Sequence, residues 1–231
     1  TFVGGVLAGR LAHNATVVAL KSPPQSGKQL LRSLANRLGL NVALSADKLC
    51  LVDQLEQHLL RLHARGRLVA LILDEAQDLS PTCLEEIRLL WNWEQNAQRL
   101  VQIVLTGQPE LRQKLLEPRW EPLRQRIVLS YHLAHLTPAD TAAYVRHRLR
   151  VAGQGQARVE FTPEALADVA LATDGTPRLI NVLCDNALLV GYAKGLHRLD
   201  RSVVAEVVRD MTCWSLRTSV AGQPALASSP T

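Results

Sequence analysis

The stretch Leu68-Val-Ala-Leu-Ile-Leu-Asp-Glu-Ala-Gln-Asp-Leu-Ser80 decides the fold of this chain: an unbroken apolar run ends in two adjacent carboxylates, Asp74 and Glu75. Such a run is typical of a strand buried on both faces of a parallel sheet. Ligands of open α/β sheets bind at the carboxyl ends of these strands, which predicts a site here. One carboxylate can hold a metal ion while its neighbour polarises water, as in a Walker B element followed by a catalytic acid. The alternative is a buried strand that merely meets solvent at this point.

Composition sets wide limits on the class of protein. The chain has 231 residues, of which 47% are hydrophobic and 20% charged, an ordinary globular balance. Its net charge of +5 is compatible with a polyanion, a nucleotide or a membrane face as partner. The four cysteines show no metal-ligand spacing and indicate reduced thiols of a cytoplasmic protein. No apolar run approaches the roughly 20 residues of a membrane helix. The chain starts at Thr1 rather than Met, which indicates a fragment of a longer protein. A membrane anchor, if the protein has one, is expected outside this sequence.

A phosphate-binding loop is predicted near the start of the chain. The β-branched stretch 16–21 predicts a strand, and the leucines at 30, 31, 34 and 38 mark one face of a helix. Between them, a tight loop ends in Gly27 and Lys28, which is the context that a phosphate loop requires. Backbone N–H groups and the helix dipole can hold phosphate oxygens there, and Lys28 would reach the β- and γ-phosphates. The candidate binding residues are Ser22, Gln25, Ser26, Gly27, Lys28 and Gln29.

This loop departs from the G-x-x-x-x-G-K-[ST] pattern. Ser22 replaces the first glycine, and Gln29 replaces the Ser or Thr whose hydroxyl binds Mg²⁺. Gln25 stands where a further glycine is often found, and it is a harder fit if that position needs a left-handed backbone. The amide oxygen of Gln29 can reach a metal on a longer arm. The alternative is a lysine that caps an ordinary βα turn.

Further strands and candidate residues follow along the chain. Strands are predicted at 41–44, 100–106 and 128–130, and helices at 2–13, 51–62 and after Ser80. Thr106 and Gln108 follow the strand expected beside the Asp74 strand, so they are candidates to touch the γ-phosphate or the attacking water. The arginines of Arg124-Gln-Arg-Ile127 can act on the nucleotide of a neighbouring subunit, or simply form surface ion pairs.

The order of elements predicts an α/β fold: a P-loop three-layer αβα sandwich with a parallel sheet, followed by a small all-helical lid domain. The nucleotide-binding domain is expected over 1–135, the lid over 136–213, and a linker or disordered tail over 214–231. Helices are predicted near 138–152, 163–173, 177–194 and 200–212, with no strands among them. The third of these begins with Pro177 and Arg178.

The order of motifs resembles the AAA+ ATPase domain of the ExeA/GspA type from about residue 7 to residue 212. The most specific stretches are Asp74-Glu-Ala-Gln77, Gly107-Gln-Pro-Glu-Leu111 and Pro177-Arg-Leu-Ile-Asn-Val-Leu-Cys-Asp185. The resemblance implies a cytoplasmic domain that binds ATP and Mg²⁺ and serves a bacterial secretion or envelope assembly. It also implies homo-oligomers, protein partners and, in full-length members, a membrane helix that tethers the domain to the cytoplasmic face of the inner membrane.

Carried over by position, the resemblance implies a role for each candidate residue. Lys28 would contact phosphate, Asp74 (with Gln29) would organise Mg²⁺, and Glu75 would activate water. Thr106 or Gln108 would be the first sensor, Arg126 the finger and Arg178 the second sensor.

Two other functions stay open. The altered loop favours a scaffold that binds nucleotide weakly or not at all and acts through protein partners. A regulator of DNA transposition is supported locally only by the basic run Arg146-His-Arg-Leu-Arg150, for which a solvated helix face is the simpler interpretation, so nucleic acid is not the expected partner.

Overall fold

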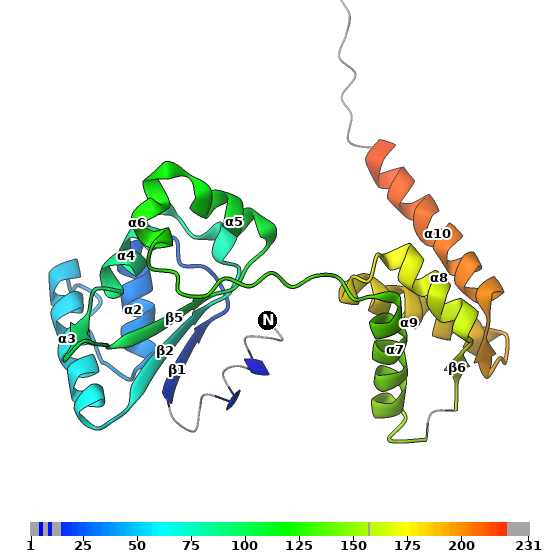
Figure 1. Cartoon of the computed structure of the whole chain (residues 1–231), viewed down its shortest axis with the longest axis horizontal. Coiled ribbons are helices and arrows are strands. Elements are labelled where there is room, and N and C mark those ends of the chain that lie inside the picture. Colours follow the sequence, from blue (N-terminus) through cyan, green and yellow to red (C-terminus); the bar gives the residue numbers. More distant parts are fainter. Residues whose placement is uncertain (1–4, 7–8, 11–14, 157, 221–231) are drawn as a thin grey trace, which may run out of the picture. The chain divides into compact units, whose positions relative to one another are not determined.

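The computed structural model describes residues 5–6, 9–10, 15–156 and 158–220, with the side chains of the last helix described as far as Met211. The chain divides into two compact units, Thr1–Ser130 and Tyr131–Thr231 (Figure 1). The helix predicted over 2–13 lies mostly outside the described residues.

A parallel sheet forms the centre of the first unit. Its strands are β1 (Ala15–Leu20), β2 (Leu68–Leu73) and β5 (Val101–Leu105), in the order β1-β2-β5. The strands predicted near 16–21, 68–73 and 100–106 are thereby confirmed, and β2 is buried at every position after its first. The register pairs Leu20 with Leu73 and Leu73 with Leu105, so all three strands end at the same edge of the sheet.

Three helices pack against one face of this sheet: α2 (Gly27–Arg37), α3 (Lys48–Ala64) and α4 (Pro81–Leu90) (Figure 1). Alternate strand residues such as Val18, Leu71 and Leu73 join the helix leucines in one core, as the two-residue period of a strand requires. Leu30 and Leu34 of α2 are fully buried, and each buried leucine contributes about 1.5–3 kcal/mol relative to exposure. Helix α2, which follows the predicted phosphate loop, is therefore anchored by its own apolar face.

Shorter elements complete the first unit. They are η1 (Ala76–Asp78), the hairpin strands β3 (Glu94–Gln95) and β4 (Gln98–Arg99), α5 (Pro109–Leu116), η2 (Pro118–Trp120) and α6 (Glu121–Arg124).

Two predicted strands are wrong. Residues 41–43 are irregular and lead into a turn at 44–45, where Ala46 N donates to Ala43 O at 3.0 Å. The Arg32 guanidinium also donates to Ala43 O. Residues 128–130 are extended but pair with no other strand among the described residues, and Val128 is 91% exposed. Both segments have β-forming composition, but a strand also needs a partner and a surface to pack on.

The second unit is mainly helical, as predicted. Its helices are α7 (Pro138–Ala152), α8 (Pro163–Thr173), α9 (Pro177–Ala193) and α10 (Arg201–Val220). Thr137 and Thr162 are the N-caps of α7 and α8, and each hydroxyl accepts a hydrogen bond from the backbone N–H three residues on.

Two details of this unit differ from the prediction. A short parallel pair, β6 (Glu160–Phe161) with β7 (Arg198–Leu199), is present where no strands were expected. Phe161 and Leu199 are both buried, so packing in the helical core holds these two segments together. Each strand has only two residues, which is too short to give a recognisable sequence pattern. The last helix, α10, continues through Val220, past the end near residue 212 that was predicted for it.

The turn before α9 predicts a large stability effect. Gly175 has φ +64°, and a Cβ there would lie 2.0 Å from the carbonyl oxygen of Leu136, whose N–H donates to Gly175 O. We expect Gly175→Ala to destabilise the chain by about 1–2 kcal/mol for the left-handed backbone, plus a further penalty because the Leu136 backbone must move. Urea unfolding followed by circular dichroism measures this change.

Gly195→Ala is the matched control. Gly195 has nearly the same backbone angle, φ +65°, but no atom lies within 4 Å of its added Cβ. Gly195→Ala should lose only the stability that the left-handed backbone costs, because its new Cβ meets no other atom. Equal losses in the two variants would contradict the close packing of Gly175 on Leu136.

Candidate nucleotide-binding site

The candidate residues of the first unit lie at the edge where the three strands end. The loop 21–26 follows β1, Asp74 follows β2, and Thr106 follows β5. Asp74 N donates to Leu20 O and Thr106 N donates to Leu73 O, so these residues continue the register of the sheet. The structure therefore brings together the loop and the two residues that sequence spacing assigned to it.

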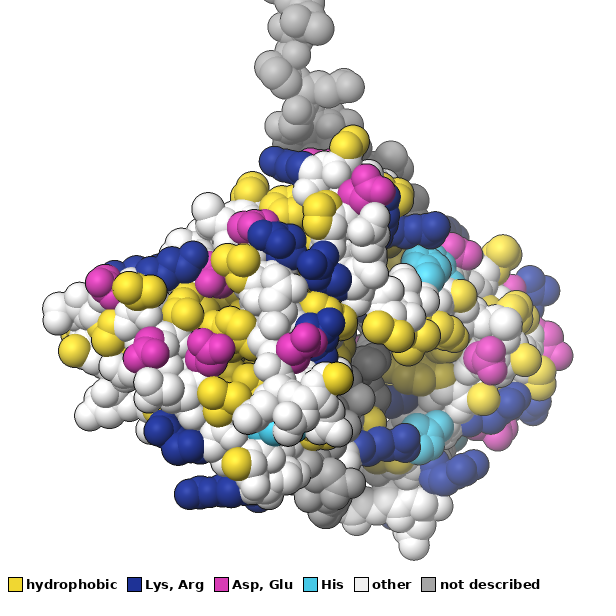
Figure 2. All heavy atoms as spheres, turned by 60° about the vertical axis from the view of Figure 1, so that its left-hand side comes forward, with side chains coloured by type: hydrophobic (Ala, Val, Ile, Leu, Met, Phe, Trp, Pro, Cys, Tyr) yellow, Lys and Arg dark blue, Asp and Glu magenta, His cyan; other side chains and the backbone are white. Residues whose placement is uncertain are grey.

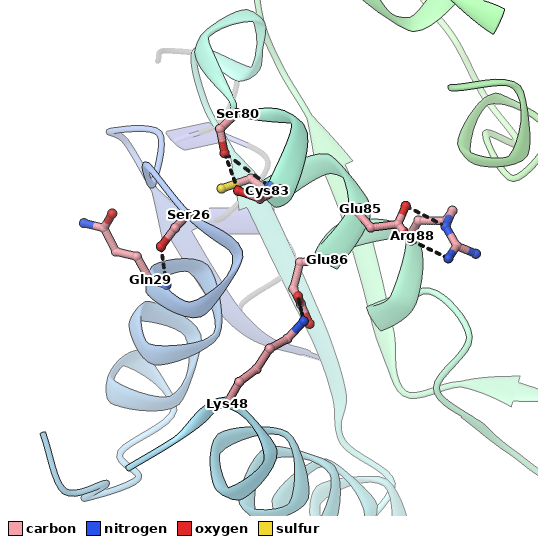
Figure 3. Close-up of polar contacts among 9 residues, drawn as sticks. Ser26, Gln29, Lys48, Ser80, Cys83, Glu85, Glu86 and Arg88 are labelled. Carbon is pink, nitrogen blue, oxygen red and sulfur yellow. Dashed lines mark hydrogen bonds and ion pairs between the residues drawn. The ribbon is translucent and has the colours of Figure 1, made fainter. Parts of the chain in front are cut away.

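The loop predicted to bind phosphate leads into a well-capped helix. Ser26 is the N-cap of α2, and its hydroxyl accepts a hydrogen bond from Gln29 N at 3.2 Å (Figure 3). Gly27 and Lys28 are the first two helical residues, so their N–H groups have no acceptor within the helix. Together with the helix dipole and the exposed Lys28 side chain, these groups favour an anion at this end of α2.

Gln29 folds back onto the loop. Its Oε1 accepts a hydrogen bond from the backbone N–H of Gln25 at 2.8 Å. The Gln29 amide oxygen thus accepts from a backbone N–H that could otherwise donate to a phosphate oxygen. This hydrogen bond must break before the same oxygen can bind a metal. Gln25 does not have the left-handed backbone considered above, because its φ is not positive. Gln25 therefore fits the loop without that strain.

The loop rests on α4 through a close contact that the sequence did not reveal. A Cβ on Gly27 would lie 2.9 Å from Oε2 of Glu86, a carboxylate that is only 3% exposed. Lys48 Nζ forms an ion pair with the same oxygen at 2.6 Å (Figure 3). The Cys83 thiol donates to Pro24 O. Helix α4 contains several polar residues, and nothing in its sequence distinguishes Glu86 as a buried one.

Asp74 is held as a carboxylate. Its Oδ1 accepts hydrogen bonds from Thr106 Oγ1 at 2.8 Å and from Glu75 N at 3.1 Å. Burial on its own would raise the pKa of Asp74, but hydrogen bonds such as these lower that pKa below its ordinary value. Asp74 is therefore negatively charged at neutral pH and suited to a hard cation such as Mg²⁺.

Glu75 has an unusual backbone. Its φ of +52° and ψ of +40° place it in the left-handed region, which residues other than glycine rarely adopt. Such conformations cluster at functional sites, where the surrounding structure maintains them. The Glu75 carboxylate accepts a hydrogen bond from Gln77 Nε2 at 2.8 Å.

The two sensor candidates have different contacts. The Thr106 hydroxyl contacts Asp74 directly, so it lies within the site. Gln108 is the N-cap of α5 without a side-chain capping bond, and its backbone N–H donates to Gln77 Oε1 at 3.1 Å. Gln77 therefore contacts both Glu75 and Gln108. The sequence pattern predicts no function for Gln77 beyond its place in the Asp-Glu-Ala-Gln motif.

The arginine candidates make other contacts. Arg124 Nη1 donates to Leu115 O and Leu116 O, where it caps the end of α5. Arg126, on the following turn, donates to Pro122 O and is half-buried. Arg178 is the second residue of α9 in the other unit and is exposed. The roles of Arg126 and Arg178 stay predictions.

The donor set suits magnesium bound with a nucleotide. Within the described residues, no group of three or more His, Cys, Asp or Glu side chains could hold a metal ion by itself. Mg²⁺ commonly uses one or two carboxylates and completes its shell with phosphate oxygens and water. Asp74 fits this pattern.

Comparison with known proteins agrees with this geometry. Residues 6–115 match the family model described as AAA domain. The chain is 39% identical over 227 residues to General secretion pathway protein A of Aeromonas hydrophila, which covers 96% of this chain and 41% of that protein. The chain thus spans about two fifths of the length of this relative.

Solved structures show the fold. The ORC2 protein of Aeropyrum pernix, in complexes with ADPNP and ADP, superposes with a TM-score of 0.60 and 17% identity over 87% of this chain and 54% of that one. Cdc6p of Pyrobaculum aerophilum gives 0.59 and 18% over 80% of this chain and 50% of that one. The fold is therefore the P-loop α/β sandwich with a helical C-terminal part, as predicted.

The chain belongs to the AAA ATPase domains of the ExeA/GspA type, which confirms the family that its motifs resemble. Among the described helices, none is both long enough and apolar enough to cross a membrane.

Proposed function

We propose that this chain binds ATP with Mg²⁺ at the carboxyl edge of its sheet and hydrolyses it in the service of a bacterial secretion or envelope assembly. The observation that carries the proposal is the hydrogen-bonded group formed by Asp74, Glu75 and Thr106 at the strand ends. This group shares its edge with the N-terminus of α2, which offers N–H groups and Lys28 to an anion. The name of the Aeromonas relative supports the secretion role.

Each residue has a part in the proposed reaction. Lys28 and the N–H groups at the start of α2 bind and orient the phosphates. Asp74 supplies a charged ligand to Mg²⁺, which on binding neutralises charge on the phosphates. Glu75 accepts a proton from the attacking water, and Thr106 fixes the Asp74 carboxylate by its hydrogen bond.

The proposed assembly is a homo-oligomer. Arg126 is assigned as the finger that a neighbouring copy presents to the nucleotide, a contribution worth about 10³–10⁵ in rate where it operates. Because a finger supplied in trans needs a second subunit, activity per chain should rise with protein concentration. Arg178 is assigned to the second sensor of the same reaction.

Nucleic acid is not proposed as the partner. On the face shown in Figure 2, Lys and Arg side chains are interspersed with acidic and uncharged ones rather than gathered in one basic field. The relationship to a secretion protein favours neither the scaffold nor the transposition alternative. Secretion or envelope proteins are the proposed partners, at the cytoplasmic face of the membrane.

Replacing Gln29 should change nucleotide affinity. Gln29→Thr removes the amide oxygen from Gln25 N–H and supplies a hydroxyl where phosphate loops bind Mg²⁺. Freeing one donor and adding one ligand should each contribute about 1 kcal/mol, so we expect ATP to bind about 30-fold more tightly in Mg²⁺. Titration with a fluorescent ATP analogue measures this affinity.

Gln29→Ala separates the two contributions. It frees the Gln25 donor without adding a hydroxyl, so its gain should be the same with and without Mg²⁺. Only Gln29→Thr should show a gain that depends on the metal. Unchanged affinity in both variants would contradict the assigned position of Gln29.

The experiment that tests the proposed function is phosphate release from ATP by the wild-type chain, measured over a range of protein and Mg²⁺ concentrations. Saturable, Mg²⁺-dependent release that rises per chain with protein concentration is expected. ATP binding without release would contradict hydrolysis and identify a nucleotide-bound scaffold instead.

A further inference from the structure

Gln77 joins two turns of the candidate site that lie far apart in sequence. Its Nε2 donates to Glu75 Oε2 at 2.8 Å, and its Oε1 accepts from the backbone N–H of Gln108 at 3.1 Å. The backbone N–H of Gln108 can only donate, so the amide oxygen of Gln77 must face it. The amide nitrogen consequently faces Glu75, and the orientation of the Gln77 side chain is fixed at both ends.

The backbone around Gln77 is also held. Lys114 Nζ donates to Gln77 O at 2.7 Å and to Leu79 O at 2.6 Å, so α5 fixes the turn η1 on which Gln77 lies. Lys114 is half-buried, which strengthens hydrogen bonds made by its charge. Ala76 N donates to Thr106 O at 2.9 Å in the same region.

The turn after β5 approaches Gln77 very closely. A Cβ on Gly107 would lie 2.6 Å from Gln77 Oε1, so a side chain at 107 would displace the Gln77 amide. Residues 106–108 and 75–79 therefore form one connected polar unit, with Gln77 between the sensor candidates and Glu75. A small shift of the 106–108 turn must move the Gln77 amide, and with it the hydrogen bond to Glu75.

We propose that Gln77 is a positioning residue that holds the Glu75 carboxylate for its role as general base and couples it to the sensor turn Thr106–Gln108. This inference rests on the proposed function. A base must be held closely in place, because a displacement of about 1 Å can cost about 10²-fold in rate. Glu75 depends on such support since its left-handed backbone is set by the surrounding turn.

The test compares Gln77→Ala and Gln77→Glu with the wild-type chain in steady-state ATP turnover. Both variants should lower kcat by about 10–100-fold and change KM less than about threefold, because Gln77 acts on the base rather than on nucleotide binding. Gln77→Glu keeps the size of the side chain and its acceptor for Gln108 N–H, but it places a second negative charge against Glu75. Its loss of activity would therefore arise from charge and not from an empty space.

Gln113→Ala is the control. Gln113 is an exposed residue of α5, the helix that also carries Lys114, and its substitution should leave kcat and KM unchanged. Far-UV circular dichroism of all variants establishes that they are folded. If Gln77→Ala unfolds, Gln77→Glu supplies the comparison.

A double-mutant cycle with Glu75→Gln separates positioning from simple structural support. If Gln77 acts through Glu75, Gln77→Ala should cost less than about threefold in the Glu75→Gln background. An equal cost in both backgrounds, or a rise in KM with unchanged kcat, would overturn the inference. Wild-type turnover with fully active Gln77 variants would overturn this inference alone, whereas absence of wild-type turnover would overturn the proposed function as well.

Discussion

Replacing Glu75 with glutamine is expected to lower ATP turnover by about 10²–10⁴-fold while ATP affinity stays close to that of the wild-type chain. The amide keeps the size of the side chain and can still contact Gln77, but it cannot accept a proton from water. Binding is preserved because the phosphates are assigned to Lys28 and the start of α2, which the substitution does not touch. Phosphate release and a fluorescent ATP titration on the same samples measure the two quantities.

Glu110→Gln is the matched control for this loss. Glu110 is an exposed carboxylate in the first turn of α5, so the same chemical change there should leave turnover unchanged. If Glu75→Gln kept most of the wild-type rate, Glu75 would not be the base, and the left-handed turn would need another explanation.

The second large effect is expected at Lys28. Lys28→Ala should weaken ATP binding by about 10²-fold, because it removes a charge that makes hydrogen bonds to phosphate oxygens, each worth about 1.5–3 kcal/mol. The Lys28 side chain is exposed, so its removal should not affect folding. Equilibrium titration with a fluorescent ATP analogue measures the change.

Lys21→Ala distinguishes a direct contact from general electrostatic attraction. Lys21 is also exposed, and it lies at the other end of the same loop. Its loss should weaken binding less than about threefold at physiological salt, since an exposed charge that makes no direct contact with the phosphates is screened by salt. Equal effects at Lys21 and Lys28 would show that the loop does not bind phosphate as assigned.

The sequence predicted those features that depend on the local pattern. An unbroken apolar run identified β2, and the strand–loop–helix order identified β1, α2 and the loop between them, because both signals are carried by neighbouring residues. Parallel strands that end at one edge then brought Thr106 next to Asp74, as expected.

Other features depend on contacts between residues distant in sequence. Glu86 is buried because α2 approaches α4 closely at Gly27, and Gln77 contacts Gln108 across 31 residues. Neither residue type nor spacing signals these contacts. The hydrogen bond from Gln25 N–H to Gln29 is local, but it depends on the rotamer of a long side chain, which composition does not determine.

The wrong strands have the same origin. Stretches 41–44 and 128–130 carry β-branched and apolar residues, yet within the described chain neither gains a neighbouring strand. In contrast, Phe161 and Leu199 lie in strands of two residues because each is buried in the helical core. In all three cases packing, rather than local propensity, determined whether a strand formed.

The most direct test of the account is a calorimetric titration of the wild-type chain with ATP in the presence of Mg²⁺. We expect saturable binding at one site per chain, weakened about 10²-fold in Lys28→Ala and retained in Glu75→Gln. Absence of binding at millimolar ATP would contradict it, and would leave a domain that keeps the AAA fold without the chemistry of its strand ends.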